Sequence, residues 1–383
     1  MVFQAPILIQ WRNVLDNILI GAEQAVAAPF CTSRLADAGA RVIKVERPGG
    51  DFARGYDNVA KGQSSYFVWL NRGKESLVVD LTSPEGKLTL GNLLVKADVL
   101  VQNLKPGALR RLGFAPEQLR KSHPRLICCS ISGYGETGPL AERKAYDLLI
   151  QAESGLSSIT GGAAEAARVD ISIVDIATGA TAHAAILEAL IARSITEDGA
   201  DIRISMFDVM ADWLTVPLLH QEGGKPPRRV GLAHPSIAPY GVFITGDDKQ
   251  ILISIQSDRE WVKFCTEFLR APALAADERF ARNVDRVRNR AATDEIVAAA
   301  FVGFNETDAK EALLRADIAF AMFNDMAALS IHPHLRRITV ETEAGPVAFP
   351  APAPIVIGAE RNYRPVPAIG EHAALVNDEK HAS

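Results

Sequence analysis

The sequence predicts an α/β protein in which a large domain holds a parallel β-sheet and a smaller α+β domain follows. Between residues 24 and 140, short β-branched runs alternate with helical patterns, as in right-handed βαβ units that build a parallel sheet. A polar segment at 221–229 contains Gly-Gly and Pro-Pro and indicates a linker. Beyond it, a hairpin pattern and three helical patterns predict the smaller domain.

The elements of the large domain are expected in a regular order. An apolar face predicts a helix over 24–38, and a Ser-Pro-Glu capping signal at 83–85 predicts another over 86–96. An Ala- and Leu-rich run predicts a long buried helix over 177–194. The expected strands are 40–46, 76–80, 97–102, 125–131 and 201–206.

The smaller domain is expected to open with a hairpin over 240–255, whose turn is Gly-Asp-Asp-Lys. Its helical patterns lie at 258–269, 292–303 and 307–315, and a β-rich stretch with three prolines follows at 336–358. The expected organisation is 1–220 for the N-terminal part of the large domain, 221–230 for a linker, 231–330 for the smaller domain, and 331–383 for a second linker and the return to the large domain.

Composition and charge exclude several classes of protein. The net charge of −5 over 383 residues argues against a nucleic-acid partner or an acidic membrane surface. No run of 18 apolar residues predicts a membrane span, and the first residues lack a secretory pattern. The four cysteines show no CxxC spacing, so we expect a cytoplasmic chain with buried thiols. Cys128 and Cys129 are neighbours on a predicted strand and should point to opposite faces.

Common catalytic and nucleotide-binding motifs are absent. The sequence has no GxGxxG, no GxSxG and no HExxH. Asn71 to Lys74 resembles the end of a phosphate-binding loop, but Val68 stands where the first glycine belongs and Glu75 where Ser or Thr belongs. His332-Pro-His334 lacks a nearby third ligand, so we expect no metal site.

Three cationic clusters follow predicted strands. They contain Arg47 with Arg54, Lys74, and Asn103 with Arg111. Ligands bind at the carboxyl ends of strands in open α/β sheets, so these clusters together predict an elongated anionic ligand such as a nucleotide with a pyrophosphate. Arginines and lysines placed by chance on solvated loops are the alternative.

Asp175 is the candidate for chemistry. It follows the apolar run 171–174 and precedes a glycine-containing helix start. A helix N-terminus favours the ionised form of a carboxyl group, and a carboxylate nucleophile requires neither a metal nor a redox centre. The alternative is a helix N-cap with no chemical role.

Several longer segments complete a recognisable set. They are Ala27 to Pro29, Gly39 to Gly49, Leu77 to Asp80, Ala97 to Asn103, Pro106 to Gly113, Ser132 to Pro139, Tyr146 to Ala152, Asp175, and Gly370 to His372. Together they resemble the class III CoA-transferases, a family that contains formyl-CoA and carnitine CoA-transferases and also the α-methylacyl-CoA racemases. The resemblance covers nearly the whole chain.

The resemblance implies a fold and a set of site residues. It implies a Rossmann-like large domain, a small domain between two linkers, and an interlocked homodimer. Asp175 falls on the catalytic aspartate of the family, and Tyr146 lies beside the thioester. The CoA-contact positions fall on Ala25, Val26, Ala27, Arg47, Lys74, Asn103, Leu104, Arg111, Lys144 and Tyr146. Coenzyme A is then a substrate, and no bound cofactor is implied.

Within the family, the sequence favours transfer over racemisation. The racemases carry His where this chain has Tyr146 and Glu where it has Gln256, so Asp175 lacks the partner that proton exchange requires. The segment Gly231 to Tyr240 replaces the glycine-rich loop of formyl-CoA transferase, which argues against formyl or oxalyl substrates. His234 and Tyr146 are candidate substrate contacts, and the chain looks more like the succinyl-, mesaconyl- and itaconate-type dicarboxylate transferases. A racemase and a non-catalytic CoA-binding protein remain the alternatives.

The resemblance also implies a relay through an aspartyl anhydride and an aspartyl-CoA thioester at Asp175. Tetrahedral oxyanions in such a relay need preorganised N–H donors. We expect these donors in the Ile176–Gly179 turn or in the Gly133–Gly138 loop.

Overall fold

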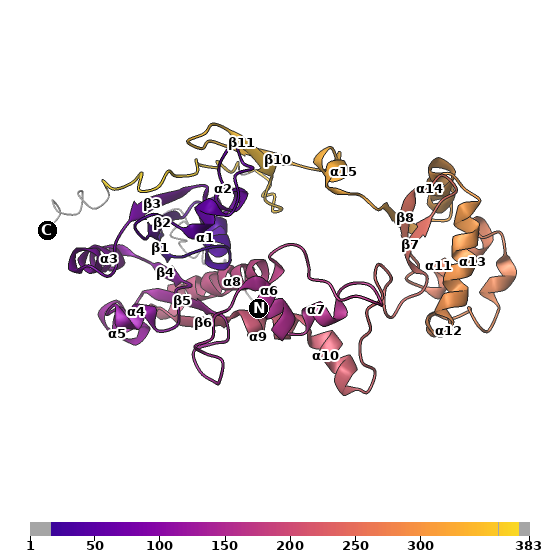
Figure 1. Cartoon of the computed structure of the whole chain (residues 1–383), viewed down its shortest axis with the longest axis horizontal. Coiled ribbons are helices and arrows are strands. Elements are labelled where there is room, and N and C mark those ends of the chain that lie inside the picture. The colour runs from indigo at the N-terminus through magenta and orange to yellow at the C-terminus, as the bar shows by residue number, and fades with distance from the viewer. Residues whose placement is uncertain (1–16, 359, 375–383) are drawn as a thin grey trace, which may run out of the picture. The chain divides into compact units, whose positions relative to one another are not determined.

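The computed structural model describes residues 17–358 and 360–374 and divides the chain into two compact units (Figure 1). The first unit comprises residues 1–156, 168–216 and 336–383, and the second comprises 157–167 and 217–335. The chain passes between the two units after residues 156, 167, 216 and 335. The last two of these points lie close to the expected linkers. The short excursion at 157–167 was not expected, because nothing in its composition distinguishes it from an ordinary loop.

A six-stranded parallel sheet forms the centre of the first unit (Figure 1). Its strand order is β3-β2-β1-β4-β5-β6. The strands are β1 (Ile18–Ala22), β2 (Arg41–Glu46), β3 (Lys74–Val78), β4 (Val99–Gln102), β5 (Ile127–Ser132) and β6 (Asp201–Ser205). The strand order reverses between β1 and β4, and in an open parallel sheet such a switch point is where ligands bind.

Helices cover both faces of this sheet. Helices α1 (Ala27–Asp37) and α8 (Ile173–Thr196) pack on one face, and α3 (Pro84–Lys96) packs on the other. The apolar residues of the strands alternate between the two cores, as in Leu19 and Ile20. Cys129 belongs to the α1–α8 side and Cys128 to the α3 side, which confirms the predicted alternation.

The remaining elements of the first unit are short. They are η2 (Phe52–Gly55), α2 (Ser65–Asn71), α4 (Ala108–Arg111), α5 (Pro116–Ser122), α6 (Asp147–Glu153), α9 (Met206–Trp213), and the antiparallel pair β10 (Arg337–Val340) and β11 (Val347–Pro350). The C-terminal segment lies along β3: the backbone N–H of His372 donates to the carbonyl of Ser76, and that of Gly73 donates to the carbonyl of Pro365.

Helix α8 differs from its prediction in extent and in burial. It begins four residues earlier than expected, and only seven of its 24 residues are buried. Among the described residues, α8 is the one helix whose length and apolar composition would suffice to cross a membrane. It packs against α1 and β5, and its buried residues belong to the core on that face of the sheet.

The second unit is an α+β fold around an aromatic core. Strands β7 (Tyr240–Ile244), β8 (Gln250–Ser254) and β9 (Ala319–Met322) form an antiparallel sheet. Its helices are α10 (Thr215–Glu222, which begins in the first unit), α11 (Asp258–Lys263), α12 (Asn283–Arg288), α13 (Arg290–Val302), α14 (Glu306–Arg315) and α15 (Met326–Ser330). The expected helix at 258–269 ends earlier, because residues 264–268 form a π-helical turn.

Candidate active site

A cavity of about 670 Å³ opens at the carboxyl edge of the parallel sheet. The residues that follow β1, β4 and β5 line it together with the N-terminal turn of α8 and the loop before α6. A smaller cavity of about 210 Å³ lies beside the ends of β2 and β3. Gln24 and Leu104 line both cavities, so the two cavities are neighbours along the edge of the sheet.

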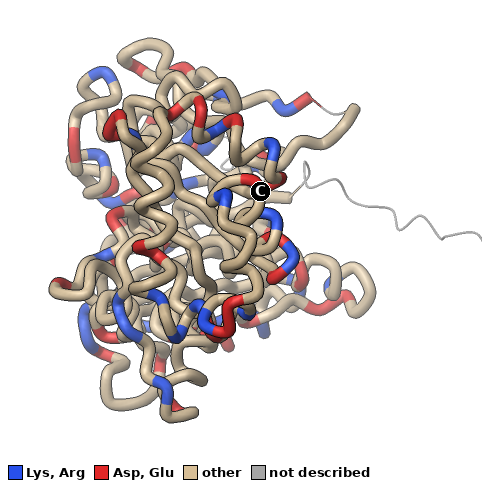
Figure 2. Tube along the Cα trace, turned by 90° about the vertical axis from the view of Figure 1, so that its right-hand side faces the viewer, with Lys and Arg blue, Asp and Glu red and all other residues tan. Residues whose placement is uncertain are grey.

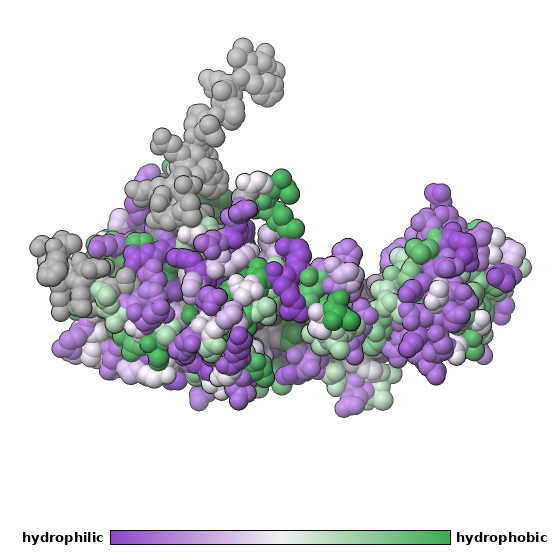
Figure 3. Space-filling model, turned by 90° about the horizontal axis from the view of Figure 1, so that it is seen from above, coloured by the Kyte–Doolittle hydropathy of each residue, from purple (hydrophilic) through white to green (hydrophobic). Residues whose placement is uncertain are grey.

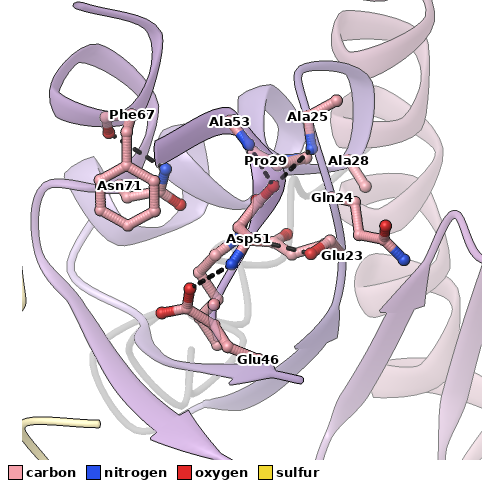
Figure 4. Close-up of polar contacts among 12 residues, drawn as sticks. Glu23, Gln24, Ala25, Ala28, Pro29, Glu46, Asp51, Ala53, Phe67 and Asn71 are labelled. Atoms are coloured by element: carbon pink, nitrogen blue, oxygen red, sulfur yellow. Dashed lines mark hydrogen bonds and ion pairs between the residues drawn. The ribbon is translucent and has the colours of Figure 1, made fainter. Parts of the chain in front are cut away.

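Hydrogen bonds with the side chains of Asn103 and Asp51 hold the loop between β1 and α1. The side-chain amide of Asn103 accepts a hydrogen bond from the N–H of Gln24 and donates one to its carbonyl, both at 2.8 Å. Asp51 accepts the N–H of Ala25 at 3.3 Å (Figure 4). Ala25 has a φ of 60°, a left-handed conformation that is uncommon for a residue with a Cβ and is fixed here by these contacts.

A cluster of fully buried, charged side chains contacts this loop and supports it. Lys44 donates to Asp51 at 2.9 Å and to the carbonyl of Glu23 at 3.3 Å. Lys74 donates to Glu23 at 2.6 Å and to Asn71 at 3.0 Å. Burial lowers the pKa of Lys74 to about 8 although Glu23 opposes that change. Removing one partner would leave an uncompensated buried charge. We therefore expect the cluster to hold the loop between β1 and α1 in one conformation.

The candidate nucleophile Asp175 lies in the first turn of α8. Its own N–H and that of Val174 donate to one carboxylate oxygen of Asp147, at 3.1 and 2.7 Å. Asp147 is the first residue of α6, so the N-terminus of one helix caps that of another. In the described part of the chain, the Asp175 carboxylate itself has no hydrogen-bond partner, and it faces the cavity.

Burial raises the pKa of Asp175 to about 7, and the negative charge of Asp147 adds to the effect. The helix N-terminus favours the ionised form, as the sequence predicted, but loss of water around the carboxylate outweighs it. A carboxyl group with a pKa near the working pH, inside a cavity, is characteristic of a reacting group.

Gly179 brings the N-termini of α1 and α8 together. A Cβ at this position would lie 2.4 Å from the carbonyl oxygen of Ala27 and 3.0 Å from the Cβ of Phe30. Asp175 is one turn before Gly179 on the same face of α8. The absence of a side chain at 179 therefore lets the nucleophile approach the start of α1.

The structure brings most of the predicted site residues together. Lining the larger cavity are Ala25, Val26, Ala27, Asn103, Leu104, Lys144, Tyr146 and Asp175. Arg47 lines the smaller cavity. Arg111 is exposed, donates to the carbonyl of Pro106, and lines neither cavity.

The two remaining predicted residues are Lys74 and His234. Lys74 is buried, and its ammonium is occupied by Glu23, so it does not reach the cavity. His234 belongs to the second unit, where its ring stacks on Tyr240 with the ring centroids 5.2 Å apart.

The prediction that the N–H groups of residues 176–179 serve as oxyanion donors is wrong. These residues lie inside α8, so their N–H groups belong to the helix; that of Ile176 donates to the carbonyl of Ser172. The N–H groups of Val174 and Asp175 are occupied by Asp147. Gly133, from the second expected group, does line the cavity. The first turn of α1 also lines it, and no side chain caps that helix.

Sequence reasoning missed several residues of the cavity. Phe52, Tyr56 and Tyr66 form one wall, with ring centroids 5.5 to 5.7 Å apart in sequence order. Burial raises the pKa of Tyr56 to about 12, with Asp51 and Asp175 contributing, so its hydroxyl keeps its proton. Arg168 and Lys105 also line the cavity. Their only signal in the sequence was position, since Lys105 follows a strand and Arg168 precedes the apolar run before Asp175.

Each of the four cysteine thiols is buried and unpaired. Burial raises the pKa of Cys128, Cys129 and Cys265 to about 12. Within residues 17–358 and 360–374, no three His, Cys, Asp or Glu side chains gather as metal ligands would.

Comparison with known proteins decides the family. A profile described as "CoA-transferase family III" matches residues 16–373. The chain belongs to CoA-transferase family III. It is therefore a transferase, and the predicted membership of this family is confirmed.

The matches to relatives and to solved structures span most of this chain and most of each matched protein. Succinate–glutarate CoA-transferase of Agrobacterium fabrum is 34% identical over 94% of this chain and 93% of its own. Acetyl-CoA:oxalate CoA-transferase of Acetobacter aceti is 41% identical over 73% and 72%. A CAIB/BAIF family protein from Brucella suis has a crystal structure with a TM-score of 0.81 and 32% identity, covering 96% of this chain and 98% of that one.

Proposed function

We propose that this transferase moves CoA from an acyl-CoA thioester to a dicarboxylic acid, with Asp175 as the covalent carrier. The observation that carries the proposal is the Asp175 carboxylate, which has a pKa of about 7 and no hydrogen-bond partner in the described part of the chain, in a cavity lined by most of the predicted CoA contacts. Dicarboxylates are named as the acids of the Agrobacterium and Acetobacter relatives.

The two neighbouring cavities suit the two ends of CoA. We assign the nucleotide end to the smaller cavity, where the Arg47 guanidinium is exposed and suits a phosphate. The pantetheine arm then runs past Gln24 and Leu104, which border both cavities, and brings the thioester to Asp175. Binding energy from the remote nucleotide would thus position the reacting carbonyl.

The chemistry proceeds as four acyl transfers. The Asp175 carboxylate attacks the thioester carbonyl, and the C–S bond breaks. This step releases CoA thiolate and forms an aspartyl anhydride. The thiolate attacks the aspartyl carbonyl, releases the first acid as a carboxylate, and forms an aspartyl-CoA thioester. The acceptor carboxylate then displaces the thiolate to form a second anhydride, whose outer carbonyl the thiolate attacks, which regenerates Asp175. Every step exchanges activated acyl groups, so no ATP is consumed.

Backbone donors are available for the oxyanions of these steps. We assign the role to the first turn of α1, which has no side-chain cap and whose Ala27 lines the cavity with Asp175. The loop at Gly133 offers a second source of donors. One such donor contributes about 3 kcal/mol to transition-state stabilisation in comparable sites.

Arg168 is the proposed contact for the second carboxylate of the acceptor. It lines the cavity with Asp175, and its pair with Asp170 at 2.6 Å is solvent-exposed and easily exchanged. Lys144 and Tyr146, on the loop before α6, complete this side of the cavity. Since one relative is named for oxalate, the acceptor class here extends from oxalate to glutarate, although the sequence argued against oxalyl substrates.

Racemisation is the second candidate, and the geometry disfavours it. Proton exchange needs an acid and a base on either side of the α-carbon. The carboxylate next to Asp175 is that of Asp147, and it is engaged by two backbone N–H groups and the amide of Gln151. Tyr146 offers a phenol at the position where the racemases carry an imidazole.

We further propose that the transferase is an interlocked homodimer of the cytoplasm. The chain crosses between its two units several times, and the crossing segments expose large apolar side chains, among them Leu219, Met326 and Ile331. Figure 3 shows apolar residues open on the surface among hydrophilic ones, while in Figure 2 both signs of charge are interspersed along the chain. Exposed apolar residues in such number are typical of an interface. Light scattering and cross-linking would test the dimer, and a monomer at micromolar concentration would refute it.

A panel of CoA thioesters and dicarboxylates, read by mass spectrometry, tests the proposed activity. Succinyl-CoA and acetyl-CoA are the donors, and oxalate, succinate and glutarate are the acceptors. We expect a new CoA thioester with wild-type protein and none with Asp175→Ala, and hydroxylamine should trap an adduct on the peptide that contains Asp175. Normal turnover by Asp175→Ala would refute the mechanism, and α-proton exchange in D₂O without any acceptor would favour a racemase.

A further inference from the structure

Gln151 is a fully buried amide behind the active site. It lies on α6 one turn after Asp147, and its side chain has no exposed surface. Its nitrogen donates to the second carboxylate oxygen of Asp147 at 2.7 Å and to the carbonyl of Val169 at 3.1 Å. Its oxygen accepts the N–H of Val169 at 2.9 Å. All three contacts reach segments that line or support the cavity.

These contacts connect three parts of the site through one side chain. Asp147 holds the N–H groups of Val174 and Asp175, and therefore the first turn of α8. Val169 is next to Arg168, one of the cations that line the cavity. Gln151 thus ties the backbone of the nucleophile to the segment that carries the proposed acceptor contact.

We propose that Gln151 is a positioning residue for the transfer reaction. It fixes the Asp147 carboxylate and the Val169 backbone in one geometry, and through them it sets the position of Asp175 relative to the acceptor acid. This inference rests on the proposed function. A misplacement of about 1 Å in a reacting group costs about 100-fold in rate, so a residue that never touches substrate is sufficient to control turnover.

The chemistry of an amide is what the site requires at 151. Two donors meet Asp147 and the carbonyl of Val169, while one acceptor meets the N–H of Val169. A carboxylate keeps the acceptor but turns both donors into acceptors, whereas a carboxylic acid regains one donor. Gln151→Glu is therefore a variant whose geometry should depend on pH.

The ionisable groups around the nucleophile come from several elements. Asp147 faces Asp175 from α6, and Lys144 and Tyr146 line the same cavity from the preceding loop. Tyr56 follows η2, and its pKa responds to Asp175. Arg168 and Asp170 line the cavity from the segment before α8. The wild-type protein contains all of these, so the ratio of variant to wild-type activity cancels their titration.

The test compares kcat of Gln151→Glu with that of wild type between pH 5.5 and 8.5, with saturating succinyl-CoA and glutarate. At low pH the new carboxyl group is protonated and donates to Asp147, so we expect a ratio within about threefold of one. As the pH rises, two carboxylates would lie at hydrogen-bond distance, and we expect the ratio to fall at least about tenfold. Gln118→Glu, an exposed amide on α5, is the matched control and should give a constant ratio near one.

The reciprocal variant Asp147→Asn with Gln151→Glu exchanges donor and acceptor across the same contact. It should recover at least about half of the activity that Gln151→Glu alone loses at pH 8.5, on a logarithmic scale. Gln151→Met, which is similar in volume and has no donor, should be impaired equally at every pH.

Melting temperatures provide a readout that does not depend on turnover. The difference in melting temperature between wild type and Gln151→Glu should widen as the pH rises. A kcat ratio that is constant with pH, or no recovery in the reciprocal variant, would overturn the inference. If wild-type protein transfers no CoA, the proposed function fails, and a melting difference that is constant with pH would independently overturn the contact at Gln151.

Discussion

Replacing Asp175 with asparagine is expected to stabilise the protein, and the stabilisation should grow as the pH rises. Folding raises the pKa of this carboxyl group from 3.8 to about 7, because burial and Asp147 both disfavour its charge. The folded state therefore holds the proton more tightly than the unfolded state. The stability from this group is fully present below about pH 4 and is lost as the pH rises through 7.

The size of the effect follows from the shift. A rise of about three pKa units at about 1.36 kcal/mol each sets a ceiling of about 4 kcal/mol well above pH 7. Solvent entering through the cavity screens the charge, so we expect about 1 to 2 kcal/mol. Asparagine has the same shape and no charge, and in the described part of the chain it breaks no hydrogen bond of the carboxylate. For a unit of about 250 residues, this corresponds to roughly 2 to 5 °C in melting temperature.

The assay is thermal unfolding of wild type and Asp175→Asn at pH 5.0 and pH 8.5, without substrate. The difference in melting temperature should be small at the lower pH and should favour the variant at the higher pH. Asp170→Asn is the control, because Asp170 lies on the same segment with its side chain 91% exposed, and it should show no such trend. A variant that is less stable than wild type at pH 8.5 would refute the argument that the charge of Asp175 is unfavourable in the fold.

Four further predictions concern activity and packing. Gly179→Ala should cost about 1 to 3 kcal/mol and reduce transfer, since its Cβ would meet a backbone oxygen of α1 at 2.4 Å. Gly91→Ala on α3, which meets nothing within 4 Å, should be neutral or stabilising, and equal effects in the two variants would contradict the packing argument. Arg168→Leu should raise KM for the acceptor acid about tenfold while KM for the CoA donor stays unchanged; a rise in the donor KM instead would assign Arg168 to CoA. Arg47→Ala should raise KM for acyl-CoA and have little effect on an acyl-pantetheine donor, and an equal rise for both donors would exclude a contact with the nucleotide. The pH profile of kcat/KM should rise with an apparent pKa near 7 as Asp175 ionises, and a profile that is flat between pH 5.5 and 8.5 would show that its ionisation does not limit the reaction.

Periodicity and caps were sufficient to predict most of the sheet. The expected strand at 40–46 is β2 almost residue for residue, and Ser83 caps α3 as its motif predicted. Strand β1 was missed, although it is central, because its short apolar run has no helix or turn signal before it. Strand β3 lies two residues earlier than expected, since its boundaries depend on pairing with β2 rather than on its own composition.

The candidate site could be predicted as a set of positions but not as a set of contacts. Asp175 was found from its place after an apolar run. The role of Lys74 could not be read locally, because its partner Glu23 is 51 residues away in the sequence. The same holds for Gln151, which meets Val169 across 18 residues. Such pairs follow from tertiary packing, and a buried lysine is rare enough that a surface contact was the natural expectation.

The largely buried carboxylate of Asp175 has a consequence for the energetics of the proposed reaction cycle. Forming an ester-like bond at that oxygen removes its charge, as protonation or the asparagine substitution does. In the proposed mechanism, the unloaded enzyme therefore carries an electrostatic penalty at Asp175, and forming the aspartyl anhydride would relieve it. Burial of the side chain should therefore shift the equilibrium of the first step towards the acylated form. In mild alkali, the acylated protein should also have a higher melting temperature than the unloaded protein.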